Sequence, residues 1–125
     1  MEKNLDLNIK ILKDIQENGS PLRGYHSQNI KIDSFSGEEI SYNLELLHDA
    51  GYVLFWDEDT HMSSEYKTFL IRRLTNSGED FVKLSSNKGA MEWVKKQILP
   101  LGGGVTLEIA KLLLEKYVKE KLHIP

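Results

Sequence analysis

Residues 36–56 read SGEEISYNLELLHDAGYVLFW, and this stretch decides how the chain folds. Ser36 and Glu39 have the spacing of a capping box, in which the serine hydroxyl and the glutamate carboxylate each accept from the other residue's backbone N–H at the start of a helix. Ile40, Leu44 and Leu47 then recur at helical spacing and form one apolar stripe. We therefore predict an amphipathic helix that begins after Ser36 and packs this stripe on a core.

The second half of the stretch ends the helix and begins a strand. Gly51 follows Ala50, and glycine is the residue that most often supplies the left-handed conformation that stops a helix. Residues 52–56 are all aromatic, β-branched or aliphatic, which favours a strand. The alternative is a longer helix that ends at Asp57, but it would need an internal glycine without penalty.

Further signals lie on the N-terminal side. Residues 5–17 are apolar over more than half of the helical circumference, which predicts a helix with two packing neighbours, the central helix and the C-terminal helix. Residues 18–21, NGSP, end this first helix. Ile30 and Ile32 alternate with polar residues, so we expect a short strand there. A second helix before the central one must then be short or missing.

A hairpin follows the central helix. Residues 66–74 are expected to form its second strand, and the polar residues 57–65, DEDTHMSSE, its long loop. Thr75 is expected to cap a short helix directly after this strand. The order of elements predicts an α+β fold, namely a winged helix-turn-helix with a β-hairpin wing and two additional C-terminal helices.

The two additional helices are separated by glycines. The first is predicted to run to Leu99, where Pro100 ends it, and Thr106 is predicted to cap the second. Residues 102–104 are three glycines without the lysine and strand of a phosphate-binding loop, so we interpret them as a hinge. We expect a single domain, with a winged-helix core at residues 1–85 and a helical extension at residues 86–125 packed on it.

Several sequence pieces are typical of a known family. These are LDLNIKILKDI, EEISYNLELLHDAGY, RLTNSGEDF and WVKK, followed by a glycine step and a last helix rich in lysine and leucine. On these pieces the chain resembles, over nearly its whole length, a family of short phage and prophage proteins of unknown function. The pattern Leu-Thr-x-x-Gly at residues 74–78 also resembles winged-helix regulators in which a strand ends in this pattern. The resemblance implies a winged-helix core and no particular activity.

Composition excludes several classes of protein. The chain has 125 residues, of which 40% are hydrophobic and 28% charged, and no apolar run approaches the roughly 20 residues that a membrane span needs. Its charged N-terminal residues, MEKNLDLNIK, lack the apolar core of a signal peptide. It contains no cysteine, which excludes disulfides, zinc–thiolate sites and thiol nucleophiles. We expect a cytoplasmic, soluble protein.

Charge is unevenly distributed along the chain. The formal net charge is only −3, but residues 33–66 contain nine acidic side chains and neither lysine nor arginine. From residue 82 onward the balance reverses, with eight lysines and four glutamates. Such asymmetry predicts which kinds of macromolecule each part can bind.

Two hypotheses of function follow from this distribution. A DNA-binding winged helix lays the central helix in the major groove and needs basic side chains for the phosphates. Here Ser41, Asn43 and His48 could touch base edges, but acidic side chains surround them, so we favour a protein-interaction module with a basic partner. The residues predicted for this acidic surface are Glu38, Glu45, Asp49, Asp57, Glu58, Asp59 and Glu65. In a phage-type protein, that surface could occupy the nucleic-acid site of a host protein. An ordinary solvated acidic surface explains the same pattern.

The alternative is a transcriptional regulator that contacts DNA through the lysine-rich C-terminal third. The residues that would touch DNA are Lys88, Lys95, Lys96, Lys111 and Lys116. These lysines are equally explained as the solvated faces of amphipathic helices.

Catalysis and cofactors are not expected. The histidines show no i, i+4 pairing, and the pair Asp59 and His61 is more simply a solvated loop than a metal site. No carboxylate pair stands beside a glycine turn or histidine at a catalytic spacing. We therefore predict a protein that is not an enzyme and has no cofactor or metal. We interpret Trp56, Trp93 and Tyr117 as core residues rather than a platform for stacked bases.

The last helix is apolar around most of its circumference near its middle. Either it is sandwiched between other helices of the chain, or it forms a homodimer interface. The sequence does not decide between packing within the chain and a homodimer. The residues predicted for such an interface are Leu112, Leu113, Leu114, Tyr117 and Val118.

Overall fold

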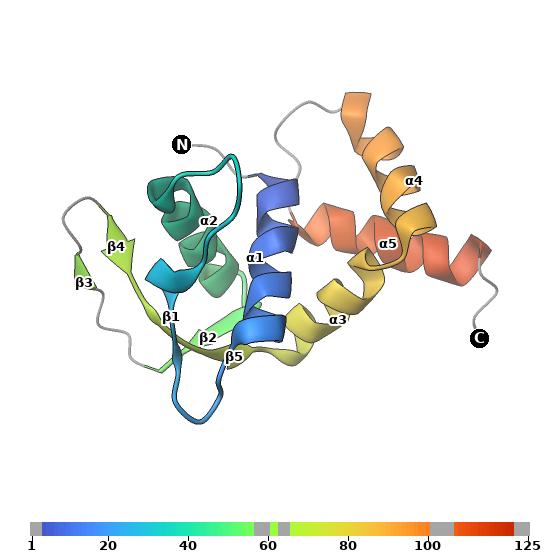
Figure 1. Cartoon of the computed structure of the whole chain (residues 1–125). Coiled ribbons are helices and arrows are strands. Elements are labelled where there is room, and N and C mark those ends of the chain that lie inside the picture. The colour runs from blue at the N-terminus through green and yellow to red at the C-terminus, as the bar shows by residue number, and fades with distance from the viewer. Residues whose placement is uncertain (1–3, 57–60, 63–65, 101–106, 122–125) are drawn as a thin grey trace. The chain divides into compact units, whose positions relative to one another are not determined.

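The structure is a computed structural model of the chain that describes residues 4–56, 61–62, 66–100 and 107–121. Within these residues the fold is α+β, with five α-helices and a small three-stranded antiparallel sheet of order β1-β5-β2 (Figure 1). The chain divides into two compact units, residues 1–79 and 80–125. The division falls inside helix α3, Asn76–Ser85.

Helix α1, Leu5–Asn18, confirms the first predicted helix. It begins at Asn4, whose side chain accepts from the backbone N–H of Leu7 at 3.0 Å, and the backbone N–H of Gly19 donates to Ile15 at its end. Its apolar face is fully buried at Leu7, Ile11 and Leu12. Within the first unit α1 packs against α2 and β5, which confirms the central helix as one of its two predicted neighbours.

Helix α2, Gly37–Asp49, has both of its predicted ends. The capping box is complete, because the Ser36 and Glu39 side chains each accept from the other residue's backbone N–H at 3.1 Å. At the other end Gly51 has a φ of 83°. The N–H of Gly51 donates to the carbonyl of His48 and that of Tyr52 to the carbonyl of Leu47, both at 3.0 Å, which is the Schellman pattern. The predicted strand follows as β2, Val53–Phe55.

The strand predicted at Ile30 and Ile32 is wrong. The strand that pairs with β5 is β1, Tyr25–His26, and a single 3₁₀ turn, η1, Ser27–Asn29, comes directly after it. The N–H of Ile30 donates back to Ser27 at 3.0 Å and its side chain is buried, so its apolar character reflects core packing and not alternation in a sheet. The short second helix expected before α2 is this one turn.

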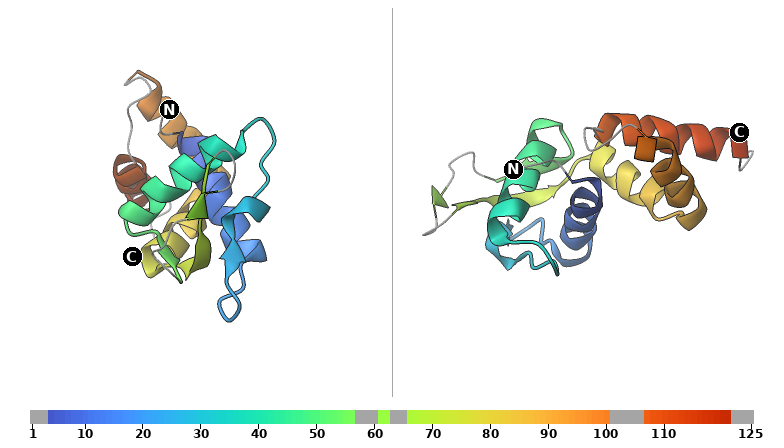
Figure 2. Two further views of the ribbon diagram at one scale, coloured as in Figure 1. Left: turned by 90° about the vertical axis from the view of Figure 1, so that its left-hand side faces the viewer. Right: turned by 90° about the horizontal axis from the view of Figure 1, so that it is seen from above.

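The predicted hairpin joins β2 to β5, Leu70–Leu74, in antiparallel register. Part of its predicted loop is itself paired, because β3, His61–Met62, lies against β4, Lys67–Thr68. Figure 1 and the right-hand view of Figure 2 show this pair at the end of the first unit that lies away from α1. Residues 57–60 and 63–65 of the loop lie outside the described residues.

Strand β5 contains a bulge. Leu54 faces Arg73 across the ladder and Phe55 faces Ile71, so Arg72 is an extra residue without a partner on β2. A bulge of this kind interrupts the alternation of side chains between the two faces of a strand. Both Arg72 and Arg73 are exposed.

The second unit is helical. Helix α4, Lys88–Ile98, begins at Asn87, whose side chain accepts from the N–H of Ala90 at 2.9 Å. It packs against α5, Leu107–Lys121, as Figure 2 shows, and the ring centroids of Trp93 and Tyr117 lie 5.7 Å apart. The predicted hinge at residues 102–104 and the predicted cap Thr106 lie outside the described residues.

Candidate interaction surface on helix α2

The outward side of α2 carries four side chains at positions i, i+4, i+7 and i+11, which fall on one face of a helix. These residues, which we call the acidic face of α2, are Glu38, Tyr42, Glu45 and Asp49. Tyr42 is 37% exposed, so an aromatic ring that the sequence analysis did not single out lies among three carboxylates. The stripe could have been found from the helical spacing alone.

The polar side chains that the sequence suggested for reading base edges point elsewhere. Ser41 is buried and its hydroxyl donates to the carbonyl of Lys67 at 2.6 Å. Asn43 is 1% exposed; its amide donates to the carbonyl of Glu39 and its Oδ1 accepts from the N–H of Asn4. The expectation that Ser41 and Asn43 lie at the surface is therefore wrong. Each side chain forms hydrogen bonds with backbone groups inside the unit.

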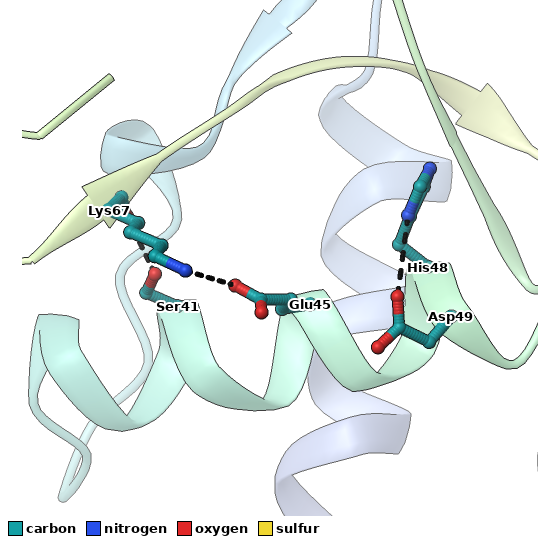
Figure 3. Close-up of polar contacts among 5 residues, drawn as sticks. All are labelled: Ser41, Glu45, His48, Asp49 and Lys67. Carbon is teal, nitrogen blue, oxygen red and sulfur yellow. Dashed lines mark hydrogen bonds and ion pairs between the residues drawn. The ribbon is translucent and has the colours of Figure 1, made fainter. Parts of the chain in front are cut away.

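His48 is half-buried by stacking. Its ring lies parallel to that of Phe55, with 4.0 Å between the ring centroids and an interplanar angle of 5°. Phe55 stacks in turn on Phe69, at 4.7 Å. The imidazole therefore contributes to the packing of α2 on the sheet. Its Nδ1 lies 3.9 Å from a carboxylate oxygen of Asp49 (Figure 3).

One carboxylate of the acidic face has a basic neighbour. The Nζ of Lys67 on β4 lies 3.5 Å from a carboxylate oxygen of Glu45, and both side chains are half-exposed (Figure 3). Lys67 is the first basic residue after the acidic stretch, so the surface is less uniformly negative than the sequence indicated. Among the residues that the structure describes, Glu38 has no basic partner, and an exposed pair such as Glu45 and Lys67 contributes about 0.2–1 kcal/mol.

Four of the predicted acidic residues cannot be placed on this surface. Asp57, Glu58, Asp59 and Glu65 lie outside the described residues. The acidic surface that can be built from the structure is therefore the face of α2 alone.

The lysines of the alternative hypothesis lie on α4 and α5 of the second unit. Lys88, Lys95, Lys96 and Lys116 are exposed, and Lys111 is half-buried. Glu92 is also exposed and lies at i+4 from Lys88 and i−4 from Lys96, on the same side of α4. The charge on this side of α4 is therefore mixed.

The predicted dimer residues of α5 separate into two groups. Leu114 is fully buried, so its side chain offers no surface to a second copy. Tyr117 packs on Trp93, and Leu113 and Val118 are half-buried. Leu112 is 65% exposed, and Ile109, which the sequence analysis did not name, is 41% exposed.

Trp56 was wrongly predicted to be a core residue. It is 47% exposed, and the guanidinium carbon of Arg72 lies 4.9 Å from its ring centroid. Arg72 and Arg73 are surface residues that the sequence pattern did not predict. Two consecutive arginines in a predicted strand were the available signal, but alternation would have sent them to opposite faces.

Tyr25 ties β1 to α1. Its hydroxyl donates to a carboxylate oxygen of Asp14 at 2.5 Å. Burial, the hydrogen bond to Asp14 and the negative charge of Asp14 all raise the pKa of the Tyr25 phenol well above its ordinary value. This pair joins β1 to α1 within the first unit.

Two other kinds of feature are absent from the described residues. No three histidine, aspartate or glutamate side chains of the described part lie close enough together to hold a metal ion. None of its helices combines the length and apolar character that crossing a bilayer requires.

A comparison with protein families gives one match. The model of a family described as hypothetical protein (DUF2513) matches residues 2–103. The chain belongs to the DUF2513 family. The DUF2513 match includes the whole acidic face of α2 and all of the sheet, whereas α5 lies beyond it. The small sheet and helices are compatible with a winged helix-like arrangement. Searches of the curated proteins and of the solved structures returned no match.

Proposed function

We propose that this DUF2513 protein is a non-enzymatic module of winged-helix and phage or prophage type that binds a basic protein partner through the acidic face of α2. The proposal rests on which side chains of this helix face outward and which bond inside the fold. Its outward side chains are Glu38, Tyr42, Glu45 and Asp49, whereas Ser41 and Asn43 are used inside the fold.

Electrostatics argues against a DNA duplex at this face. Duplex DNA carries one negative charge for about every 1.7 Å of its axis, and binding proteins neutralise these phosphates with lysine and arginine. The acidic face would bring carboxylates toward phosphates, and Lys67 already lies beside Glu45. Buried Ser41 and Asn43 have no free groups for the bases.

The same arrangement suits a basic protein surface. Carboxylates around an aromatic side chain provide charge complementarity, which speeds encounter and rejects acidic competitors, and tyrosine is enriched among residues that dominate binding energy. Because the Glu45 and Lys67 pair is half-exposed, an arginine of a partner can compete with Lys67 for Glu45.

The test compares two labelled probes at low salt, a short non-specific duplex and an arginine-rich peptide. We expect binding to the peptide and not to the duplex. The variant Glu38→Gln/Asp49→Gln should weaken peptide binding by at least about tenfold, since it removes two charges of the acidic face. The matched control Glu17→Gln/Asp33→Gln removes two exposed charges elsewhere in the first unit and should change it less than about twofold.

The alternative, DNA binding through the C-terminal lysines, predicts the opposite pattern. Duplex binding would be tight and salt-sensitive, and it would be lost on changing Lys95, Lys96 and Lys111 to glutamine. Such a result would replace the proposal.

A further inference from the structure

The bulge in β5 gives the first unit a second charged feature, unrelated to the acidic face of α2. Because Arg72 is the extra residue of the bulge, two consecutive arginines line the same hollow, although neighbours in a regular strand face opposite sides. The hollow has a volume of about 100 Å³ and lies between the end of α1 and β5. We call Arg72, Arg73 and this hollow the twin-arginine site.

Both guanidinium groups are held by contacts with groups that carry no charge. Arg72 lies over the ring of Trp56, and Arg73 donates from one of its terminal nitrogens to the carbonyl of Leu74 at 2.8 Å. In the part of the chain that the structure describes, neither has a carboxylate within ion-pairing distance. Contacts with a ring or a carbonyl orient a guanidinium and keep other N–H groups available for a bidentate ligand.

The turn before β1 leaves room for the Trp56 ring because residue 24 is a glycine. Gly24 has a φ of 81°, and a Cβ atom there would lie 2.7 Å from a methyl carbon of Leu70 and 3.1 Å from Cδ1 of Trp56. The absence of a side chain at Gly24 therefore lets Leu70 and Trp56 lie close to the turn before β1. Trp56 remains 47% exposed, and Leu22 in the same turn is 95% exposed.

We propose that the twin-arginine site binds a side-chain carboxylate of an acidic protein segment, with the neighbouring part of that segment packed on Trp56. Arginine pairs with carboxylates through two parallel N–H···O bonds, and tryptophan and arginine are the residue types most enriched at binding hot spots. A water needs about 10–15 Å³ of such space, so a hollow of about 100 Å³ admits a carboxylate with part of its stem.

Two features favour a protein carboxylate over a nucleic-acid phosphate. Glu79 lines the hollow, fixed by a hydrogen bond from the Gln16 amide at 3.1 Å, so the positive charge of the two arginines is confined to a short stretch of surface, which is enough for one carboxylate. A nucleic-acid strand also needs a continuous basic track.

The experiment titrates the whole chain with three probes, namely a hexaglutamate peptide, inorganic phosphate and oligothymidine, while the side-chain N–H signals of arginine are followed by NMR. We expect hexaglutamate to shift the Nε–Hε signals of Arg72 and Arg73. The variant Arg72→Gln/Arg73→Gln should weaken hexaglutamate binding by at least about tenfold. The variant Arg72→Lys/Arg73→Lys, which keeps the charge but not the planar fork, should recover only part of this loss.

A matched control separates a specific site from general attraction of anions. Lys10→Gln/Lys31→Gln also removes two exposed positive charges from the first unit, including one that lies over an aromatic ring, since the Nζ of Lys10 is 5.9 Å from the centroid of Phe35. Its hexaglutamate affinity should stay within about twofold of the unchanged protein. An equal loss in this control, or tighter binding of oligothymidine or phosphate than of hexaglutamate, would overturn the proposal.

Discussion

The hydroxyl of Thr75 donates to the carbonyl oxygen of Gly51 at 2.6 Å, and the same oxygen atom of Thr75 accepts from the N–H of Gly78 at 3.1 Å. The N–H of Thr75 also donates to the carbonyl of Tyr52. Thr75 therefore caps α3 and also links α3 to the end of α2. This connection explains the Leu-Thr-x-x-Gly pattern at residues 74–78. Leu74 is buried in the core, Thr75 bonds to the carbonyl of Gly51, and Gly78 lies against the carbonyl of Tyr52.

Replacing Thr75 should show how much this connection stabilises the first unit. We expect Thr75→Val to lower the free energy of unfolding by about 1–2 kcal/mol, since it removes a helix cap and leaves the Gly51 carbonyl without its donor. Urea denaturation followed by circular dichroism measures the change. Thr75→Ser keeps the hydroxyl and should cost less than half as much; a cost for Thr75→Ser as large as that for Thr75→Val would contradict the assignment of this stability to the hydroxyl.

Gly78 should tolerate no side chain. A Cβ atom there would lie 2.3 Å from the backbone carbonyl oxygen of Tyr52, so α3 would have to move away from the strand that follows α2. We expect Gly78→Ala to cost about 1–3 kcal/mol of unfolding free energy by overpacking. Gly51→Ala is the useful comparison, since nothing lies within 4 Å of a Cβ atom there and only its φ of 83° opposes the change. It should cost about 1 kcal/mol, and a smaller effect at Gly78 than at Gly51 would contradict the steric argument.

Asn43 joins the start of α1 to α2. It donates to the carbonyl of Glu39 at 3.0 Å and accepts from the N–H of Asn4 at 3.1 Å, while the Asn4 side chain caps α1. Asn43→Leu should cost about 1–3 kcal/mol, because the partly buried N–H of Asn4 loses its acceptor. Hydrogen exchange of the Asn4 amide should accelerate in this variant. Tyr42→Leu, on the exposed neighbouring position, should leave both measurements nearly unchanged.

Alkaline pH should weaken the contribution of Tyr25. Its pKa in the folded chain is raised above the ordinary value of 10.0, so the stability it contributes is fully present below about pH 10 and is lost as the pH rises toward the higher folded value. The difference in unfolding free energy between the unchanged protein and Tyr25→Phe should therefore shrink above about pH 10. Asp14→Asn keeps a hydrogen-bond acceptor but removes the charge, and it should reduce this pH dependence. A difference that stays constant from neutral pH into this range would show that folding leaves the phenol unperturbed.

Local patterns predicted the ends of the central helix correctly. The Ser36 and Glu39 capping box and the Gly51 stop depend on hydrogen bonds between residues at most five apart in the chain, so the residue types and their spacing were sufficient. The same holds for Thr75 as a cap of α3. Patterns failed where the partner is distant. The position of β1 depends on its pairing with β5, and the apolar residue Ile30 could serve a strand or a turn equally well.

The sequence by itself determined that this protein is an α+β chain of capped helices and a hairpin, with acidic residues gathered around α2. Helix caps, glycine stops and apolar periodicity act within a few residues, so they can be recognised without coordinates. Only the tertiary structure decided that Ser41 and Asn43 turn inward, that Lys67 lies beside Glu45, and that Arg72 and Arg73 share one hollow. Each of these depends on strand register or on contacts between segments far apart in the chain, which residue spacing does not specify.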